Sequence, residues 1–434
     1  MPKEEVFDVA VVGGGSAGVA ASLAASRLGA RTLLVERCDI LGGNATGAFV
    51  HTICGLYLPA GGATDAQPAH PGLPQHFADA LVRAGAAGDV ERAGRVFVLS
   101  TEPTRMAAFE ADLCKRARNL SLRLNAELVG AELTASPGGW SALALGDGST
   151  ATARVVIDTS GDAAAAALGG AELEGAAPEI LQFPSFIFRL AGVDTRELEG
   201  FGRLRLTHAV AGAARARELP PGCESVLVRR GLAAGEVYVT LNLPKLAGRA
   251  YDPLDAEYAA DLHQQAVASA HTLVEFLIRS RPAFAKARIA ELPGRVGIRE
   301  TRRVAGLASV QEEDVLAARR RPDEVAVSTW PIELWHDHRR AEFTYPEGPS
   351  SIPLGALISR SHPLLGMAGR CLSASHEALG ALRVIGTALA TGEAIGTAAA
   401  LAADAGTDLA AVEPARVRDT IREWAERERF FDGA

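Results

Sequence analysis

The pattern of apolar and polar positions is clearest in the first 36 residues. An apolar run over residues 7–12 is followed by a glycine-rich turn and then by a dozen positions rich in alanine. A second apolar run reaches Val35, and Glu36 follows it at once. This succession predicts a strand, a helix and a second strand, so residues 6–36 are expected to form a βαβ unit.

The rest of the chain divides into segments with helical and with strand-like spacing. Helical spacing recurs at residues 73–85 and 102–118, and over the long stretch 252–281. Residues 121–157 alternate between apolar runs and turn signals, which predicts a β-meander. Further strands are predicted at residues 95–99, 183–194, 224–230 and 236–244.

Two domains are expected, because 434 residues exceed what one ordinary hydrophobic core holds. The texture of the sequence changes near Gln182, where longer strand-like runs begin. We therefore predict an α/β fold whose first domain is discontinuous, with residues 1–178 plus 346–434, and contains the βαβ unit and the inserted β-meander. Residues 179–345 are predicted to form a second, α+β domain.

The glycines of the first turn have the spacing of a Rossmann-type dinucleotide-binding site. Gly13 permits the tight turn, Gly15 lets a diphosphate approach the backbone, and Gly18 allows the helix to pack closely on the sheet. Backbone N–H groups at the start of the helix favour the phosphate charges. Glu36 stands where a carboxylate accepts hydrogen bonds from ribose hydroxyls. A glycine turn in an unrelated α/β protein is the alternative interpretation.

Later segments narrow the choice of dinucleotide. Residues 38–48 read CDILGGNATGA, residues 155–162 read VVIDTSGD, and residues 366–399 begin GMAGRCLSASHEALGALR. Together with GIRETRR at 297–303, they resemble the bacterial FAD-dependent oxidoreductase family, within the superfamily of glutathione reductase-like and succinate dehydrogenase-like flavoproteins. The resemblance spans nearly the whole chain. It is looser between residues 180 and 290, where the substrate is expected to be recognised.

The resemblance implies that FAD is the cofactor, that the first domain binds it, and that the second is the substrate domain. In that superfamily the loop at 38–48 follows the diphosphate, and the segment at 155–162 returns to the adenosine end. The C-terminal segment closes over the flavin ring. The cofactor-binding residues implied in this chain are Gly13, Gly15, Ser16, Ala17, Gly18, Glu36, Arg37, Gly42, Gly43, Asn44, Ala45, Thr46, Ser160, Gly161, Asp162, Gly369, Arg370, Gly380 and Leu382.

Three residues near the expected flavin are candidates for catalysis. His376 precedes a helix expected to begin near Gly380, and its side chain suits proton transfer near neutral pH. Arg383 lies in an apolar run, where a charge needs a partner, either a substrate carboxylate or an internal ion pair. His51 lies in the loop expected to pass the flavin, where it could line the pocket or carry a covalently attached FAD.

Two other polar clusters have open interpretations. The arginines at 295, 299, 302 and 303 form either a solvated face with acidic partners or a fork that binds a carboxylate or the diphosphate. The stretch TWPIELWHDH at 329–338 is either a metal site of the HxH type or an aromatic loop packed against the second domain. The sequence places no third metal ligand for that stretch.

Composition limits the possible partners. A net charge of -8 and an aromatic content of 5% disfavour a nucleic-acid partner. The longest apolar candidate, residues 384–403, contains Glu393 and is interpreted as a buried helix, and no cleavable leader is recognised. We therefore expect a cytoplasmic protein without a membrane partner, and leave open whether it is a homo-oligomer. The five cysteines form no CxxC pair, which argues against a disulfide reductase.

These features favour a flavin-dependent dehydrogenase or oxidase that takes hydride from a small-molecule substrate. The chain has one dinucleotide fingerprint and no second one for NADPH. We expect a small polar substrate whose carboxylate suits the arginines, and an electron acceptor that is oxygen or a separate carrier. The alternatives are an NAD(P)H-dependent flavin monooxygenase, a non-redox flavoenzyme such as an isomerase or lyase, and a noncatalytic FAD-binding regulator.

Overall fold

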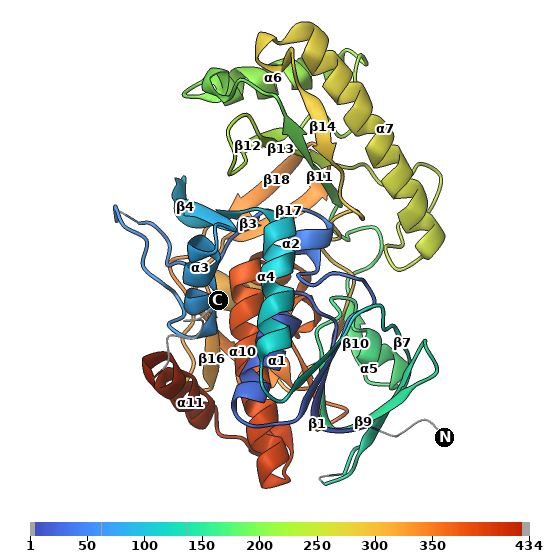
Figure 1. The fold of residues 1–434 in the computed structure, drawn as a ribbon, viewed down its shortest axis with the longest axis vertical. Helices are drawn as coiled ribbons and strands as arrows, with labels where there is room; N and C mark the ends of the chain where they lie inside the picture. The colour runs from blue at the N-terminus through green and yellow to red at the C-terminus, as the bar shows by residue number, and fades with distance from the viewer. Residues whose placement is uncertain (1–4, 62, 137, 428–434) are drawn as a thin grey trace.

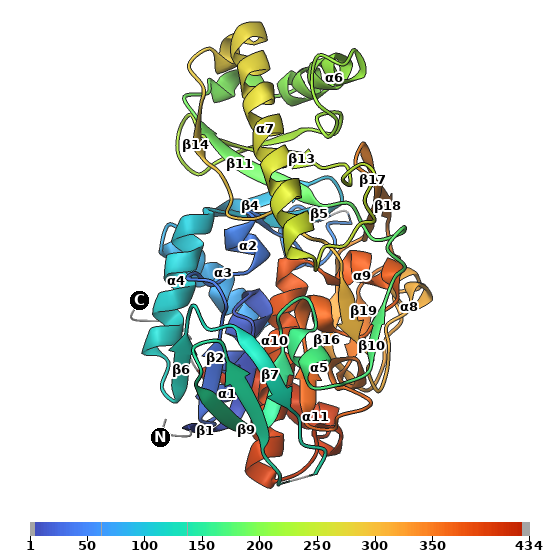
Figure 2. The same ribbon diagram turned by 90° about the vertical axis from the view of Figure 1, so that its right-hand side faces the viewer.

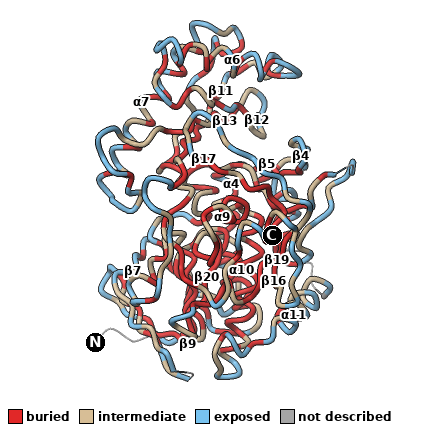
Figure 3. Tube along the Cα trace, turned by 180° about the vertical axis from the view of Figure 1, so that it is seen from behind, coloured by how far each residue is buried: buried red, intermediate tan, exposed pale blue. Residues whose placement is uncertain are grey.

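The computed structural model describes residues 5–61, 63–136 and 138–427, which form two lobes (Figures 1 and 2). The lower lobe in these views contains both the N-terminal βαβ unit and the C-terminal helices. The upper lobe contains the segment from β11 (Ser185–Ala191) to β14 (Arg288–Glu291). In Figure 3 the buried backbone is concentrated in the lower lobe, around α10 and β20.

A largely parallel sheet forms the centre of the lower lobe, with the strand order β6-β2-β1-β9-β8-β7. Strand β8 pairs with the first half of β9, and β20 pairs with the second half. Strands β6, β2, β1, β9 and β20 are parallel, whereas β7 and β8 run antiparallel to their neighbours. The bounds are β1 (Glu5–Val12), β2 (Thr32–Val35), β6 (Leu120–Arg123), β7 (Leu128–Glu132), β8 (Ser141–Leu145), β9 (Thr150–Asp158) and β20 (Leu365–Met367).

This sheet confirms the predicted βαβ unit and corrects the predicted meander. Strands β1 and β2 flank helix α1 (Ser16–Arg27), as expected for residues 6–36. In the stretch 121–157, β7, β8 and β9 form the meander, whereas β6 pairs in parallel with β2. The apolar spacing of a short strand does not reveal which strand it pairs with, so the sequence alone assigned β6 to the meander.

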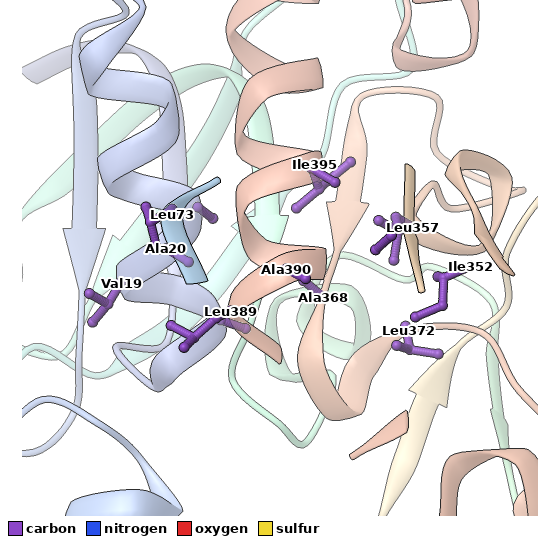
Figure 4. Packing of buried hydrophobic residues seen from close by; sticks show 14 of the residues in the cluster. Val19, Ala20, Leu73, Ile352, Leu357, Ala368, Leu372, Leu389, Ala390 and Ile395 are labelled. Atoms are coloured by element: carbon purple, nitrogen blue, oxygen red, sulfur yellow. The ribbon is translucent and has the colours of Figure 1, made fainter. Parts of the chain in front are cut away.

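The longest helix of the lower lobe, α10 (Ile385–Ala405), packs directly on α1. A Cβ at Gly392 or Gly396 would lie 2.2 Å from a carbonyl oxygen of α1, so the two glycines permit this approach. Figure 4 shows Leu389 between the two helices and Ile395 on the opposite side of α10. By length and composition α10 could cross a membrane, but 89% of its apolar window is buried inside the protein. The predicted buried helix is therefore confirmed.

The one charged residue in the first half of α10, Glu393, has structural partners. Its carboxylate accepts hydrogen bonds from the backbone N–H of Leu73 at 2.9 and 3.0 Å and lies 3.3 Å from Arg27 Nη2. Leu73 is the first residue of α3 (Leu73–Arg83), and the preceding Gly72 has no side chain that could cap that helix. Glu393 thus supplies the cap from another part of the chain.

The upper lobe is built on a four-stranded antiparallel sheet with the order β12-β13-β11-β14. Strands β12 (Leu227–Arg230) and β13 (Val237–Asn242) confirm two of the predicted strands, and α7 (Ala256–Ser280) confirms the predicted long helix. Helices α6 (Gly202–Arg215) and α7 lie against one face of the sheet (Figures 1 and 2). The apolar cluster of this lobe draws its buried residues from Leu181 to Val296.

Shorter elements complete both lobes. Helix α4 (Pro103–Arg116) and β5 (Val96–Thr101) confirm two further predictions. The remaining strands are β3 (Thr52–Ile53), β4 (Ala87–Ala93), β10 (Leu173–Gly175), β15 (Arg302–Val304), β16 (Glu324–Ser328), β17 (Ile332–Asp337), β18 (Arg340–Thr344) and β19 (Ser350–Pro353). The remaining helices are α2 (Asn44–Gly47), α5 (Ala164–Leu168), α8 (Glu312–Leu316), α9 (His376–Leu382), α11 (Pro414–Arg427) and five short 3₁₀ turns.

The segment that follows the upper lobe in the chain, from Val310 to the hairpin β17–β18, contacts both lobes. Val310, Val315 and Leu334 belong to the apolar cluster of the lower lobe. The hairpin β17–β18 also contacts the upper lobe, where the Phe183 N–H donates to the carbonyl of Trp335 at 2.8 Å. The predicted end of the second domain at residue 345 stays a prediction. The packing of Val310, Val315 and Leu334 in the lower lobe favours a return of the chain to that lobe soon after Val296.

Candidate cofactor and active site

Two glycine-rich loops lie against each other at the carboxyl ends of β1 and β2. The N–H of Gly42 donates to the carbonyl of Gly14 at 2.8 Å, and Gly15 forms a parallel bridge with Gly42. Gly13 has a φ of 100°, and a Cβ there would lie 2.5 Å from Ser160 Cα. The turn therefore requires glycine at position 13, and a ligand can approach its backbone closely because no side chain intervenes.

The two glycine-rich loops, at residues 13–15 and 42–43, are called the glycine cradle below. The N-terminus of α1 opens onto it. Gly15 is its N-cap residue and provides no side-chain cap, so the first N–H groups of the helix are available to a ligand. A cavity of about 310 Å³ runs along the cradle and is lined by Ser16 and Ala17. A helix N-terminus with uncapped amides suits the phosphates of a dinucleotide.

The carboxylate of Glu36 is fixed at the edge of the cavity. It is 7% exposed and accepts hydrogen bonds from the N–H of Gly14 at 2.6 Å and of Cys38 at 2.9 Å. A carboxylate has about four acceptor positions, so two bonds leave capacity for the hydroxyls of a ribose. This geometry fits the role predicted for Glu36.

Asp162 joins two predicted arginines at the opposite wall. It lies 3.2 Å from Arg370 Nη2 and 3.7 Å from Arg37 Nη2, and it accepts a hydrogen bond from the Thr301 hydroxyl at 3.1 Å. Arg370 also donates to the carbonyl of Ile298 at 2.8 Å. These contacts hold positive charge beside the cradle, where it favours a diphosphate.

Most of the predicted cofactor-binding residues line this one cavity. They are Gly13, Gly15, Ser16, Ala17, Glu36, Arg37, Gly42, Gly43, Asn44, Ala45, Ser160, Gly161, Asp162, Gly369 and Arg370.

Four other predicted residues are not among those that line the cavity, although each lies close to it. A Cβ at Gly18 would lie 1.9 Å from the carbonyl oxygen of Gly13, which is the predicted packing role. Thr46 donates its hydroxyl to the carbonyl of Leu41. Gly380 packs on β17, and Leu382 is fully buried in the core. All four support the elements around the cavity.

Sequence reasoning missed two groups of cavity residues. Ala126, Glu127 and Leu128 follow β6, and their place at the carboxyl edge of a parallel sheet would have been expected had β6 been assigned to that sheet. Val296 and Ile298 come from the segment that connects the lobes. No local sequence signal marks Val296 and Ile298, because their contact with the cavity depends on the path of the chain from the upper lobe back to the lower one.

Arg383 and the N-terminus of α10, through Ile385 and Ala388, also line the cavity. The sequence predicted a helix near Gly380, but the structure has two helices. Helix α9 begins at His376, the Ser375 hydroxyl caps it by accepting from the Ala378 N–H at 3.1 Å, and Arg383 separates it from α10. The N-cap of α10 is Val384, which provides no side-chain cap.

The side chain of Arg383 is 11% exposed and has an incomplete set of partners. Its Nη2 donates to Gln182 Oε1 at 3.1 Å and to the Glu333 carbonyl at 3.0 Å, and it lies 4.0 Å from Glu333 Oε1. Among the described residues, neither Arg383 Nε nor Gln182 Nε2 has a hydrogen-bond acceptor, although both atoms are buried. Burial lowers the pKa of Arg383, and the charge of Glu333 opposes this effect.

A second arginine lies near Arg383. Arg299 stacks on Trp335, with its guanidinium carbon 4.6 Å from the ring centre, and donates to Asn242 Oδ1 at 2.7 Å. Burial and the charge of Arg383 lower the pKa of Arg299 to about 9, which leaves it charged at neutral pH. The charge of Glu333 acts on both Arg383 and Arg299 and opposes the lowering of their pKa values.

Glu333 is held in place by two tryptophans. The indole N–H groups of Trp335 and Trp330 donate to its two carboxylate oxygens at 2.7 and 3.0 Å. Although burial acts to raise the pKa of Glu333, the charge of Arg383 and these hydrogen bonds lower it overall. The aromatic stretch at 329–338 thus packs against both lobes, and no group of three metal-ligating side chains occurs in the described part of the chain.

The two candidate histidines are not among the residues that line the cavity. His51 stacks on Tyr238 with ring centres 4.2 Å apart, and burial lowers its pKa to about 3. It is therefore neutral near pH 7. His376 Nδ1 lies 2.8 Å from Glu300 Oε2, and its Nε2 lies 3.4 Å from His336 Nε2. A direct role for either ring at the flavin stays a prediction.

The predicted arginine cluster separates into different environments. Arg295 lines the cavity. Arg299 belongs to the site described above that it forms with Arg383, Gln182 and Glu333, called the donor-rich site from here on. Arg302 donates to the carbonyl of Asp162 at 2.8 Å, and the buried Arg303 lies 2.8 Å from Glu300. One member thus lines the cavity and others have internal partners, with Arg303 buried rather than on a solvated face; ligand binding by the cluster stays a prediction.

Comparison with known proteins agrees with this geometry. Residues 8–421 match the family described as FAD dependent oxidoreductase. No match was found among curated proteins. The fold is similar to that of a geranylgeranyl bacteriochlorophyll reductase-like protein from Thermoplasma acidophilum, with a TM-score of 0.50 and 14% identity over 98% of this chain and 86% of that one. A p-nitrophenol 4-monooxygenase from Pseudomonas putida has a TM-score of 0.46 and 14% identity, over 99% and 87%. At these identities the likeness extends to the fold alone.

Proposed function

Because the chain belongs to the FAD-dependent oxidoreductase family, we propose that it is a dehydrogenase or oxidase acting on a small carboxylate-bearing substrate. FAD, when bound, accepts a hydride from the substrate at its flavin ring. The glycine cradle, the N-terminus of α1 and Glu36 would hold the adenosine and diphosphate. Arg383 and the N-terminus of α10, which line the same cavity, would hold the flavin head.

One observation carries the choice of substrate, namely the excess of buried donors around Arg383. Arg383 lies no closer than 4.0 Å to a Glu333 carboxylate oxygen, while Arg383 Nε and Gln182 Nε2 have no acceptor in the described part of the protein. Leaving a buried donor unpaired costs about 1–3 kcal/mol. A substrate carboxylate supplies the missing acceptors, and the planar guanidinium of Arg383 suits it.

The protein contributes orientation and electrostatics to hydride transfer. Arg383, fixed by Gln182 and Glu333, would hold the carboxylate so that the adjacent C–H faces the flavin. The N-terminus of α10 opens on the same cavity and favours negative charge there. The two tryptophans over Glu333 limit the access of water to the charges.

The remaining aspects of the proposal follow from the sequence. The reduced cofactor would pass its electrons to oxygen or to a separate carrier. We propose a cytoplasmic location and a small-molecule substrate, with neither a nucleic-acid nor a membrane partner. Assembly into a homo-oligomer stays open.

The test is anaerobic reduction of the holoprotein by candidate metabolites. Each carboxylic acid is compared with its neutral amide, and reduction is followed as bleaching of the flavin absorption. We expect an acid to bleach the flavin and its amide to do so far more slowly. Equal rates for acids and amides, or bleaching by neutral substrates alone, would contradict the proposal.

Variants at Arg383 identify the residue that holds the carboxylate. Because a hydrogen bond to a charged group contributes about 1.5–3 kcal/mol, Arg383→Gln should weaken substrate binding roughly 10- to 100-fold. Arg383→Lys should recover part of the loss. Arg249→Gln, in an exposed ion pair with Asp261 on the upper lobe, is the matched control and should leave binding unchanged. Flavin content shows whether each variant is folded.

A further inference from the structure

Three side chains form a line of contacts from the protein surface to a fully buried carboxylate. His336 on β17 is exposed, and its Nε2 lies 3.4 Å from Nε2 of His376, the first residue of α9. The Nδ1 of His376 lies 2.8 Å from Oε2 of Glu300, which has no exposed surface. No other pair of histidine rings is in contact among the described residues, and neither ring belongs to a metal-ligating group there.

The atoms in this line suit the passage of a proton. Two imidazole nitrogens at hydrogen-bond distance need one proton between them, so one ring donates and the other accepts. His376 can take a proton at one ring nitrogen and release one at the other, because its Nδ1 faces Glu300 and its Nε2 faces His336. Although burial acts to raise the pKa of Glu300, contact with His376 lowers it overall, so the carboxylate is ionised.

The buried end of the line lies beside the proposed substrate site. Glu300 follows Arg299, which belongs to the donor-rich site, and Ile298 before it lines the cofactor cavity. The charge of Glu300 also raises the pKa of Arg383, against the larger opposing effect of burial. Thr301, next in the chain, donates its hydroxyl to Asp162 at 3.1 Å. Glu300 therefore lies on the segment that forms one wall of the site.

We propose that Glu300, His376 and His336 form a proton path between the substrate site and solvent, with His336 as its outer end. The proposal rests on the proposed function. When the substrate is oxidised, one hydrogen leaves as hydride with both electrons and goes to FAD, and a second leaves as a proton. That proton passes to the Glu300–His376 pair, and His336 releases a proton to water. All three side chains return to their original states, so the path consumes nothing.

Other charged groups near the histidine pair influence its titration. Arg303 lies 2.8 Å from Glu300 and 3.9 Å from Glu174, so positive charge balances the buried carboxylate. The charged groups on the elements packed around α9 are Glu300, Arg303, Glu174, Glu333, Asp337, Glu312, Glu313, Asp314, Arg370, Arg383 and the neighbouring Glu377.

The first test follows the histidines by NMR in the holoprotein labelled with nitrogen-15 in histidine. Two rings that share a proton titrate as a coupled pair. We expect His336 and His376 to titrate in two linked steps in the wild type. In His336→Gln, His376 should titrate in a single step. His338→Gln is the matched control, two residues along the same hairpin, and should leave the pair unchanged. Independent titration of the two rings would overturn the path.

The second test measures flavin reduction by an identified substrate without oxygen. We expect His336→Gln to slow reduction about tenfold or more, because acid–base steps of this kind contribute roughly 100- to 10,000-fold. Added imidazole should restore the rate in this variant and have no effect on His338→Gln. An unchanged rate, or a loss that imidazole does not rescue, would overturn the proposal. If no substrate reduces the wild type, the proposed function itself fails, while the NMR titration still decides whether the rings are coupled.

Discussion

Glu110 on α4 lies fully buried beneath the second glycine loop of the cradle. A Cβ at Gly42 would lie 2.6 Å from its Oε2, and neither carboxyl oxygen has a hydrogen-bond partner among the described residues. Burial raises the pKa of Glu110 well above its usual value of 4.5, which favours the neutral acid.

The raised pKa of Glu110 predicts how stability changes with pH. Above its usual pKa the unfolded chain loses this proton while the folded protein keeps it, which favours unfolding. The unfolding free energy of the wild type, relative to Glu110→Gln, should therefore fall as pH rises above 4.5, by at most about 1.4 kcal/mol per unit. Urea unfolding of both holoproteins between about pH 5 and pH 8 measures this difference. A difference that stays constant with pH would contradict the assignment.

Residues whose role is local could be predicted from the sequence, and residues whose role depends on distant partners could not. Gly13, Gly15 and Glu36 act within one βαβ unit, so their spacing was sufficient. The two alternatives for Arg383 could not be separated, because its partners Gln182 and Glu333 come from distant segments. His376 was a candidate by type and position, yet its contacts with Glu300 and His336 depend on three separate elements.

At the scale of elements, the packing of α1 on α10 couples two parts of the cavity wall. Gly392 and Gly396 bring α10 against the backbone of Ala17 and Ala21 in α1. The N-terminus of α1 forms part of the cradle, and the N-terminus of α10 lines the same cavity. A change in the distance between the helices would therefore displace the parts that hold the cofactor.

Substitution of a single glycine tests this packing. A Cβ at Gly396 would lie 2.2 Å from the carbonyl oxygen of Ala21, so Gly396→Ala should destabilise the protein by about 1–3 kcal/mol and lower its flavin content. Gly212→Ala on α6 is the matched control, since no atom lies within 4 Å of the added carbon. That variant should be unchanged or up to about 1 kcal/mol more stable. Equal stabilities in urea unfolding would show that the close approach is not needed.

The two wrong predictions of elements have the same physical reason. Strand β6 was assigned to the meander because its pairing with β2 is not encoded in its own spacing. The break between α9 and α10 was missed because LRVIG has no proline or glycine at the break itself. It occurs where Arg383 turns to meet Glu333 and Gln182, which are tertiary partners. Long, strongly periodic elements such as α7 were predicted correctly.

At the scale of the whole molecule, the donor-rich site exists because the lobes meet. Gln182 precedes and Arg299 follows the segment β11–β14 that builds the upper lobe, Glu333 comes from the hairpin β17–β18, and Arg383 lies between α9 and α10 of the lower lobe. The sequence predicted two domains, one for the cofactor and one for the substrate. It could not predict which polar side chains the two lobes would leave unpaired.

The central claim is that the substrate itself, rather than a nicotinamide cofactor, reduces the flavin. The most direct measurement is rapid mixing of the oxidised holoprotein with NADH or NADPH without oxygen, compared with mixing with a carboxylate substrate. Our account predicts that the flavin absorption persists with either nicotinamide and bleaches with the carboxylate alone. Rapid bleaching by NADPH in the absence of substrate would contradict it and favour a monooxygenase.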